Sequence, residues 1–94
     1  MDIDAVFIPQ DIEEKLWDKH HVTREEVEQA LDSDSRFHFA ETGHVHGENL
    51  YRGIGQTEAG RHLVVIFIYK SDQSALVISP RDLTAKERKQ YAKK

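Results

Sequence analysis

The strongest constraint on the fold is an unbroken apolar run of six residues, Leu63 to Ile68. Six residues is the length of a strand, whereas a helix that spans a bilayer needs about 18 apolar residues or more. A strand that is apolar on both faces belongs in the middle of a sheet. We therefore expect a central strand over residues 61–69, with the rest of the chain arranged around it.

The length and composition of the chain indicate a single domain. With 94 residues, of which 38% are hydrophobic, the chain suffices for one modest core. We accordingly predict one domain over residues 1–94. The absence of cysteine and of a basic flank followed by an apolar stretch at the N-terminus favours a cytoplasmic protein that does not contact membranes.

Alternating apolar residues and turn signals place further strands around the central one. We expect a strand at residues 5–8, another beginning at residue 36, a connection over residues 41–49, and strands at residues 50–56 and 75–79. Pro80 is predicted to close the last strand, because proline has no N–H to donate to a sheet.

Three capping boxes predict helix starts. The first helix should run from about residue 12 to 21, the second to about residue 32, and the third along the C-terminal segment; the boxes are Asp11/Glu14, Thr23/Glu26 and Thr84/Glu87. The expected fold is α+β, a mainly antiparallel sheet with two N-terminal helices and a C-terminal helix on one face. The C-terminal helix has so few apolar residues that we expect it to depend on docking to the sheet.

Charge is distributed unevenly along the chain. The net charge of −4 divides into −9 over residues 1–50 and +5 over residues 51–94. A basic second half is suited to a phosphate-bearing partner, and an acidic first half to a basic one.

Several short motifs occur in an order that resembles the BrnT family of toxins from bacterial toxin–antitoxin pairs. They are Lys19-His20-His21-Val22, residues 51–55 ending in Ile-Gly, Gly60-Arg61 before the apolar run, Ile78-Ser79-Pro80-Arg81, and Glu87-Arg88 followed by Tyr91. The resemblance implies a RelE-like fold, metal-independent cleavage of RNA, and neutralisation by a cognate antitoxin that itself binds DNA. Contact with DNA would then be indirect, through the antitoxin.

Three residues depart from the family pattern. His21 replaces a glycine, Leu50 replaces an arginine that commonly precedes the strand tyrosine, and Pro80 replaces an alanine. The sequence pI of about 5.8 is also low for a RelE-like ribonuclease. Two hypotheses therefore stand: an endoribonuclease toxin, or a catalytically weak or inactive antitoxin-binding module of an autoregulatory complex.

Metal-independent RNA cleavage uses the 2′-OH as nucleophile, so the protein must supply a base, an acid, and cations for the developing phosphorane charge. The resemblance points to Arg61 and Arg81 as cations, and to Lys19, His20 and Glu87 as acid or base candidates. The RNA-binding candidates are Arg52, Arg88, Lys89 and Tyr91. We expect Arg61, Arg81 and Arg88 to converge on one edge of the sheet.

Each candidate also has an interpretation without catalysis. The arginines are then solvated charges at element ends, and His20 belongs to the apolar stripe of the first helix. Glu87 is then only the capping-box partner of Thr84, and Tyr91 a core anchor. His38, His44 and His46 lack the fixed geometry of a metal site, so we expect no metal and no cofactor.

Overall fold

The structure is a computed structural model that describes residues 2–32, 36–41 and 49–92, with the backbone alone at residues 36, 41, 91 and 92. The strands are β1 (Ala5–Phe7), β2 (Arg36–Glu41), β3 (Leu50–Gln56), β4 (His62–Tyr69) and β5 (Ser74–Asp82). The helices are α1 (Gln10–Lys15), which continues as a π-helical turn η1 (Leu16–His20), then α2 (Arg24–Asp32) and α3 (Ala85–Ala92). The predicted α+β class is confirmed.

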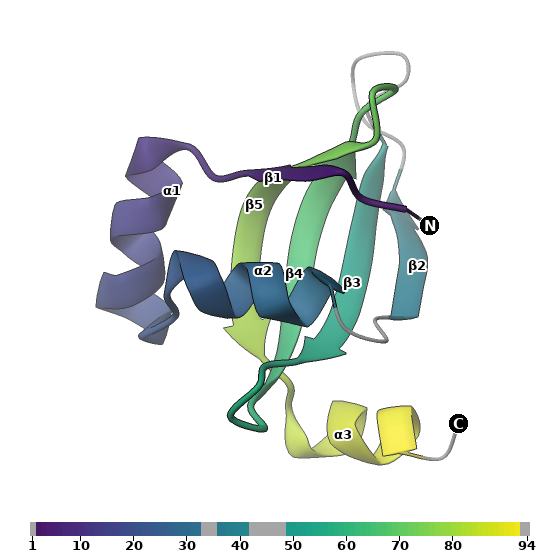
Figure 1. The fold of residues 1–94 in the computed structure, drawn as a ribbon. Helices are drawn as coiled ribbons and strands as arrows, with labels where there is room; N and C mark the ends of the chain where they lie inside the picture. The colour runs from purple at the N-terminus through teal and green to yellow at the C-terminus, as the bar shows by residue number, and fades with distance from the viewer. Residues whose placement is uncertain (1, 33–35, 42–48, 93–94) are drawn as a thin grey trace.

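The five strands form one sheet in the order β1-β5-β4-β3-β2 (Figure 1). The β2–β3, β3–β4 and β4–β5 pairs are antiparallel, and the β1–β5 pair is parallel. β4 lies at the centre of the sheet, as its unbroken apolar run predicts. Leu63, Val64 and Val65 at its start are fully buried.

Helix α2 crosses one face of the sheet and closes the core (Figure 1). Val27, Ala30 and Leu31 of α2 belong to one buried cluster with residues 63, 65 and 67 of β4 and residues 75 and 77 of β5. The helix approaches β3 closely at Gly53, where an added Cβ would lie 2.8 Å from the Leu31 Cδ2 atom. A glycine in the middle of this strand is thus explained by the close approach of α2.

The second and third capping boxes are confirmed, and the first is wrong. Thr23 and Glu26 exchange reciprocal side-chain to backbone hydrogen bonds of 3.0 and 3.1 Å, and Thr84 and Glu87 do so at 2.9 and 3.1 Å. Helix α1 begins one residue before Asp11, with the extended Pro9 at its N-cap and no side-chain cap. Pro9 lies just outside the helix with a ψ of 146°, so the helix starts at Gln10 and Asp11 lies inside the first turn.

Two further expectations about the C-terminal third need correction. β5 does not end at Pro80 but continues to Asp82. The reason is that β1 covers only Ser74–Leu76, which leaves β5 an edge strand at Pro80, where a missing N–H is tolerated. Helix α3 extends from the end of β5 instead of covering the face that α2 covers (Figure 1), so a single helical face is not confirmed.

Candidate active site at one end of the sheet

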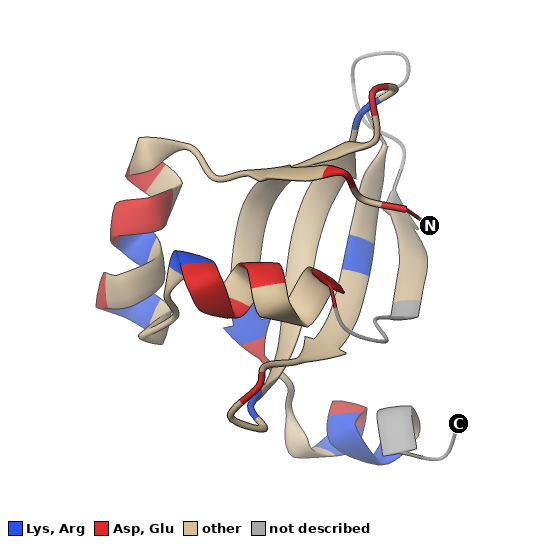
Figure 2. Ribbon diagram, in the orientation of Figure 1, with Lys and Arg blue, Asp and Glu red and all other residues tan. Residues whose placement is uncertain are grey.

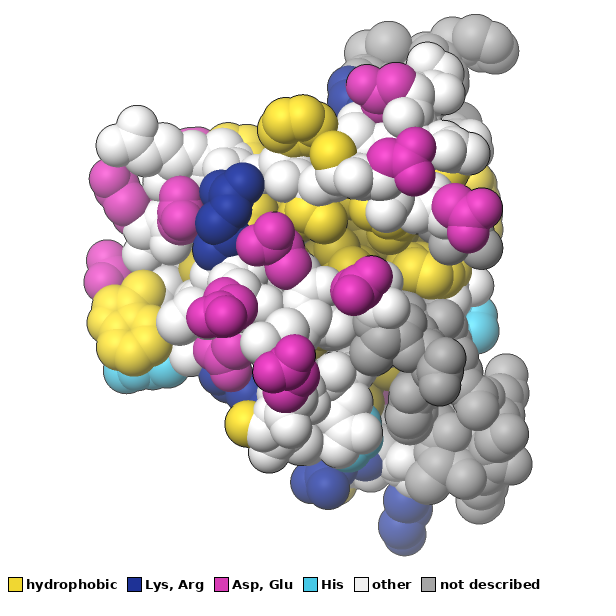
Figure 3. Space-filling model, in the orientation of Figure 1, with side chains coloured by type: hydrophobic (Ala, Val, Ile, Leu, Met, Phe, Trp, Pro, Cys, Tyr) yellow, Lys and Arg dark blue, Asp and Glu magenta, His cyan; other side chains and the backbone are white. Residues whose placement is uncertain are grey.

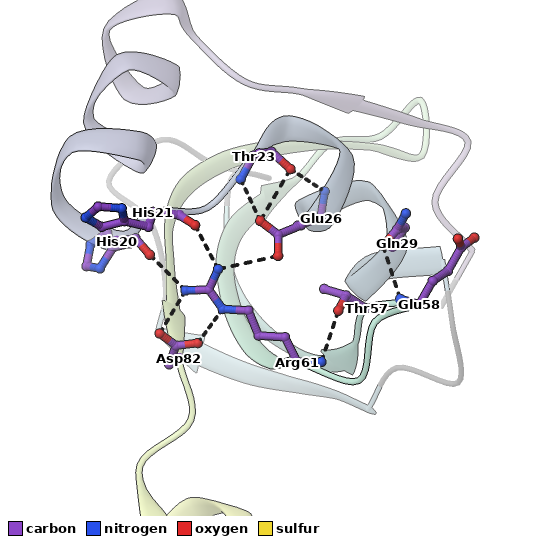
Figure 4. Close-up of polar contacts among 9 residues, drawn as sticks. All are labelled: His20, His21, Thr23, Glu26, Gln29, Thr57, Glu58, Arg61 and Asp82. Carbon is purple, nitrogen blue, oxygen red and sulfur yellow. Dashed lines mark hydrogen bonds and ion pairs between the residues drawn. The ribbon is translucent and has the colours of Figure 1, made fainter.

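Arg61 stands immediately before β4 and organises the polar contacts at this end of the sheet (Figure 4). Its Nε and Nη2 atoms donate to the two carboxylate oxygens of Asp82, at 2.7 and 2.9 Å. Nη2 also donates to the His20 carbonyl at 2.8 Å, and Nη1 donates to the His21 carbonyl at 2.8 Å and to Glu26 at 3.4 Å. A guanidinium carries five N–H groups, so these five bonds use every donor of Arg61.

The backbone of Arg61 is fixed as well. Its N–H donates to the Thr57 hydroxyl at 3.0 Å, and its carbonyl accepts from the Thr57 N–H at 2.8 Å. Thr57 is buried, so this turn holds Arg61 rigidly at the start of β4. The hydrogen bonds of Arg61 lower the pKa of Asp82, and the charge of Arg61, followed by that of His20, adds to the effect. The same hydrogen bonds, which Arg61 donates to Asp82, raise the pKa of Arg61.

The Arg61 contacts tie down the C-terminal end of η1. The last carbonyl groups of a helix have no partner within the helix, and a cation there is favourable. Arg61 supplies both the donors and the charge, while His21 turns the chain with a φ of 51°. The rings of His20 and His21 point away from the guanidinium (Figure 4). Lys19, also in this turn, is exposed.

Arg81 and Glu87 form a second ion pair at this end of the sheet. Arg81 Nη1 and Nη2 donate to the two Glu87 carboxylate oxygens at 2.7 and 2.9 Å, and Nη1 also donates to the Asp82 carbonyl at 3.3 Å. These bonds, with the Thr84 N–H, lower the pKa of Glu87 to about 2. A carboxylate with so low a pKa is a weak general base near neutral pH. It orients Arg81 and anchors α3.

The two ion pairs lie on opposite faces of the sheet. Asp82 is in register with Leu63, whose side chain is in the α2 core, whereas Arg81 is in register with Val64, which points to the other face. Arg61 and Arg81 thus lie at the same end of the sheet, but the two side chains do not share a face. Arg88 and Lys89 are exposed on α3, next to the Arg81 pair in sequence.

The remaining RNA-binding candidates are Arg52 and Tyr91. Arg52 is exposed near the middle of β3, in register with Ile66, and so stands apart from the ion pairs at the sheet end. Tyr91 contributes backbone to α3, but its side chain lies outside the described residues.

Sequence reasoning missed two acceptors of the Arg61 cluster, Asp82 and Glu26. The capping box uses one carboxylate oxygen of Glu26, and the second accepts from Arg61. Asp82 was hidden because the strand was predicted to end at Pro80. A strand continued past Pro80, paired with the start of β4, would have placed Asp82 near Arg61.

A hollow of about 410 Å³ lies elsewhere, between β1 and α2. Carboxylates surround an apolar floor on this face (Figure 3), and none of the predicted site residues lines the hollow. Among the described residues no group of three or more metal-ligating side chains exists. His44 and His46 lie outside the described residues.

A family model of BrnT ribonuclease toxins from type II toxin–antitoxin systems matches residues 11–87. The chain belongs to this family. The match extends from the first turn of α1 through Glu87, so it includes all members of both ion pairs. Arg88, Lys89 and Tyr91 lie beyond it. A comparison with curated proteins gives no match.

Membership in the BrnT family confirms the resemblance that the sequence motifs indicated and gives the chain a general function, that of a ribonuclease toxin with an antitoxin partner. In the part of the chain that the structure describes, no helix is long and apolar enough to cross a membrane.

Proposed function

We propose that this protein is a metal-independent endoribonuclease of the bacterial cytoplasm, a single RelE-like domain over residues 1–94 that a DNA-binding antitoxin neutralises. The observation that carries the proposal is the Arg61 cluster, which fixes the Lys19–His20 turn to the end of the sheet. Pre-organised groups of this kind lower a barrier without reorganisation during the reaction.

In the proposed reaction the 2′-OH of the substrate attacks the adjacent phosphorus, and the 5′-oxygen of the next nucleotide leaves. Lys19 and His20 are the acid and base candidates, since the end of η1 holds both and imidazole exchanges protons near neutral pH. Because Arg81 lies on the other face of the sheet from the Lys19–His20 turn, its proposed role is to bind a phosphate of the RNA backbone through Nε, which takes no part in its bonds to Glu87 and Asp82. Arg88 and Lys89 attract the RNA backbone.

Arg61 acts in this proposal as a positioning residue. Every one of its N–H groups already has a protein acceptor, so contact with phosphate would require one of these bonds to break. Glu87 likewise positions Arg81, because its lowered pKa makes it a weak base.

The second candidate function is a catalytically weak or inactive antitoxin-binding module. The engagement of Arg61 and Glu87 in internal ion pairs favours it, because two of the predicted catalytic groups then serve the fold. A cleavage assay separates the two functions.

The test uses purified protein, free of antitoxin, with a single-stranded RNA in excess EDTA. We expect cleavage in EDTA and none at a nucleotide whose 2′-oxygen is methylated. Replacing His20 with Gln or Lys19 with Gln should slow cleavage by about 100-fold. Lys15→Gln, on the exposed side of α1, is the matched control and should leave the rate unchanged. Activity that requires added zinc or magnesium, or cleavage at the methylated nucleotide, would contradict the mechanism.

A further inference from the structure

The sheet face opposite α2 carries an apolar row that crosses four strands. Phe7 of β1 is in register with Leu76 of β5, Leu76 with Ile68 of β4, and Ile68 with Leu50 of β3. Neighbouring residues in a strand point to opposite faces, and their neighbours Val6, Val77 and Phe67 belong to or pack against the α2 core. The row therefore lies on the face away from α2.

Aliphatic side chains continue along this face below the first row. The next rows contain Ile66, Ile54 and Val64, and the irregular pairing between β4 and β5 places Ile78 beside them. Phe7 and Ile78 are 53% and 40% exposed, and the other apolar members except Val64 are partly exposed. Helices α1, η1 and α2 contribute their apolar residues to the opposite face, so none of them covers these rows. We call this surface, formed by the seven apolar strand residues 7, 50, 54, 66, 68, 76 and 78, the open face.

The positive charge of the open face comes from Arg52, because Arg81 is paired with Glu87. Arg52 stands among its apolar residues, exposed and in register with Ile66, and Arg81 lies at its lower end. Among the strand residues whose side chains the structure describes, none on this face is acidic; the side chain of Glu41, which is in register with Leu50, lies outside the description, and Glu87 reaches Arg81 from α3. The other side of the molecule is acidic along α1 and α2 (Figure 2). A partner for the open face thus needs aliphatic groups together with negative charge.

The chemistry of this face favours a protein over RNA. Sheets that bind RNA bases present aromatic side chains on which the bases stack. The open face is mainly aliphatic: its one described phenyl ring, Phe7, stands on the edge strand β1, and the imidazole groups of His38 and His62 stand outside the aliphatic rows. An apolar patch rimmed by charge is typical of a protein–protein interface.

We propose that the open face is the docking surface of the antitoxin, which covers it with an amphipathic segment whose aliphatic side contacts Phe7, Ile66 and Ile78 and whose carboxylates face Arg52. This inference rests on the antitoxin partnership and deepens it by naming the surface and the chemistry of the docking segment. It does not depend on whether the toxin is catalytically active.

The test measures the dissociation constant between this protein and the product of the adjacent open reading frame by calorimetry. Phe7→Glu and Ile78→Glu should each weaken binding about tenfold or more, because each buries an unpaired charge against the apolar segment. Arg52→Glu should also weaken it. Phe39→Glu is the matched control: Phe39 is 55% exposed on the other edge strand, but its ring packs against Tyr51 on the α2 side of the sheet. It should leave affinity unchanged.

Thermal unfolding of each variant shows whether it is folded. If Phe7→Glu fails to fold, Ile78→Glu and Arg52→Glu at exposed positions still decide the matter. The proposal would be overturned if Ile78→Glu and Arg52→Glu both bound the antitoxin with unchanged affinity, or if the wild-type protein did not bind it. The proposal would also be overturned if the variants lost binding to an uncleavable 2′-O-methyl RNA but kept their affinity for the antitoxin. That result would assign the face to RNA. A dimer of the isolated protein that these variants dissociate would assign it to a second copy. RNA cleavage by the same proteins is measured separately, so failure of the ribonuclease function remains distinguishable.

Discussion

At the scale of single residues, the same arginine can serve a substrate or the fold, and its partners decide which. The side chain of Arg61 is 27% exposed and engages two carboxylates and two carbonyls. These acceptors come from η1, the turn after it, α2 and β5. One side chain thus joins the start of β4 to residues 20–26, which are 35 to 41 positions away in the sequence, and to Asp82, which is 21 positions away.

Replacing Arg61 with Lys tests this positioning role. An ammonium keeps the charge but has three donors on one nitrogen and no planar fork, so it cannot reproduce contacts in four directions. We expect the free energy of unfolding in urea to fall by about 1–2 kcal/mol, the range for charged hydrogen bonds at a partly exposed site. Cleavage should slow in parallel because the Lys19–His20 turn loosens.

Arg24→Lys is the control, since Arg24 is exposed on α2 and its ion pairs with Glu13 and Glu28 are long, at 3.9 Å, so it should tolerate the change. A full loss of cleavage in Arg61→Lys with no change in the free energy of unfolding would instead indicate direct contact between Arg61 and phosphate.

At the scale of elements, the position of α2 depends on the absence of a side chain at Gly53. A Cβ there would also lie 3.2 Å from the Phe37 ring and 3.3 Å from the Phe67 ring, in addition to its contact with Leu31. Because α2 carries Glu26 of the Arg61 cluster, this close packing also sets the geometry of the candidate site.

Gly53→Ala should therefore lower the free energy of unfolding by about 1–3 kcal/mol, the usual cost of overpacking a core. Chemical denaturation measures the loss. Leu31→Val removes the atom that clashes, so the double variant should lose less than the sum of the two single variants. Strict additivity would show that α2 does not press on Gly53.

At the scale of the whole molecule, folding converts the unequal charge of the two halves of the chain into two surfaces. Acidic residues of α1 and α2 lie together, and the basic residues of α3 lie beyond the end of the sheet at which β5 ends (Figure 2). An overall net charge of −4 does not prevent RNA binding, because the local charge near α3 is positive.

The affinity for single-stranded RNA should fall as salt rises, with each neutralised phosphate contributing about 0.7 to the slope of log affinity against log salt. Arg88→Gln together with Lys89→Gln should reduce that slope by about 1.4, since each cation neutralises one phosphate. Fluorescence anisotropy with 2′-O-methyl RNA measures it without cleavage. Arg24→Gln, on the acidic α2 side, should leave the slope as it is. An equal effect of Arg24→Gln would place the RNA on the other surface.

The sequence by itself determined the elements and the family. The apolar run of β4, the alternation of Phe37 and Phe39 in β2 and two capping boxes are local patterns, because periodicity and capping involve residues only a few positions apart. Motif order also identified BrnT, which the family match confirms.

Only the tertiary structure decided which side chains meet. Arg61 and Asp82 are 21 residues apart, Arg61 and His21 are 40 apart, and β1 reaches β5 across most of the chain. Such contacts depend on strand register, and a shift of one residue moves every side chain to the other face. Because β5 continues past Pro80 in this register, Asp82 lies beside Arg61, whereas Arg81 lies on the opposite face of the sheet. The same register leaves the aliphatic rows of the open face uncovered by α2.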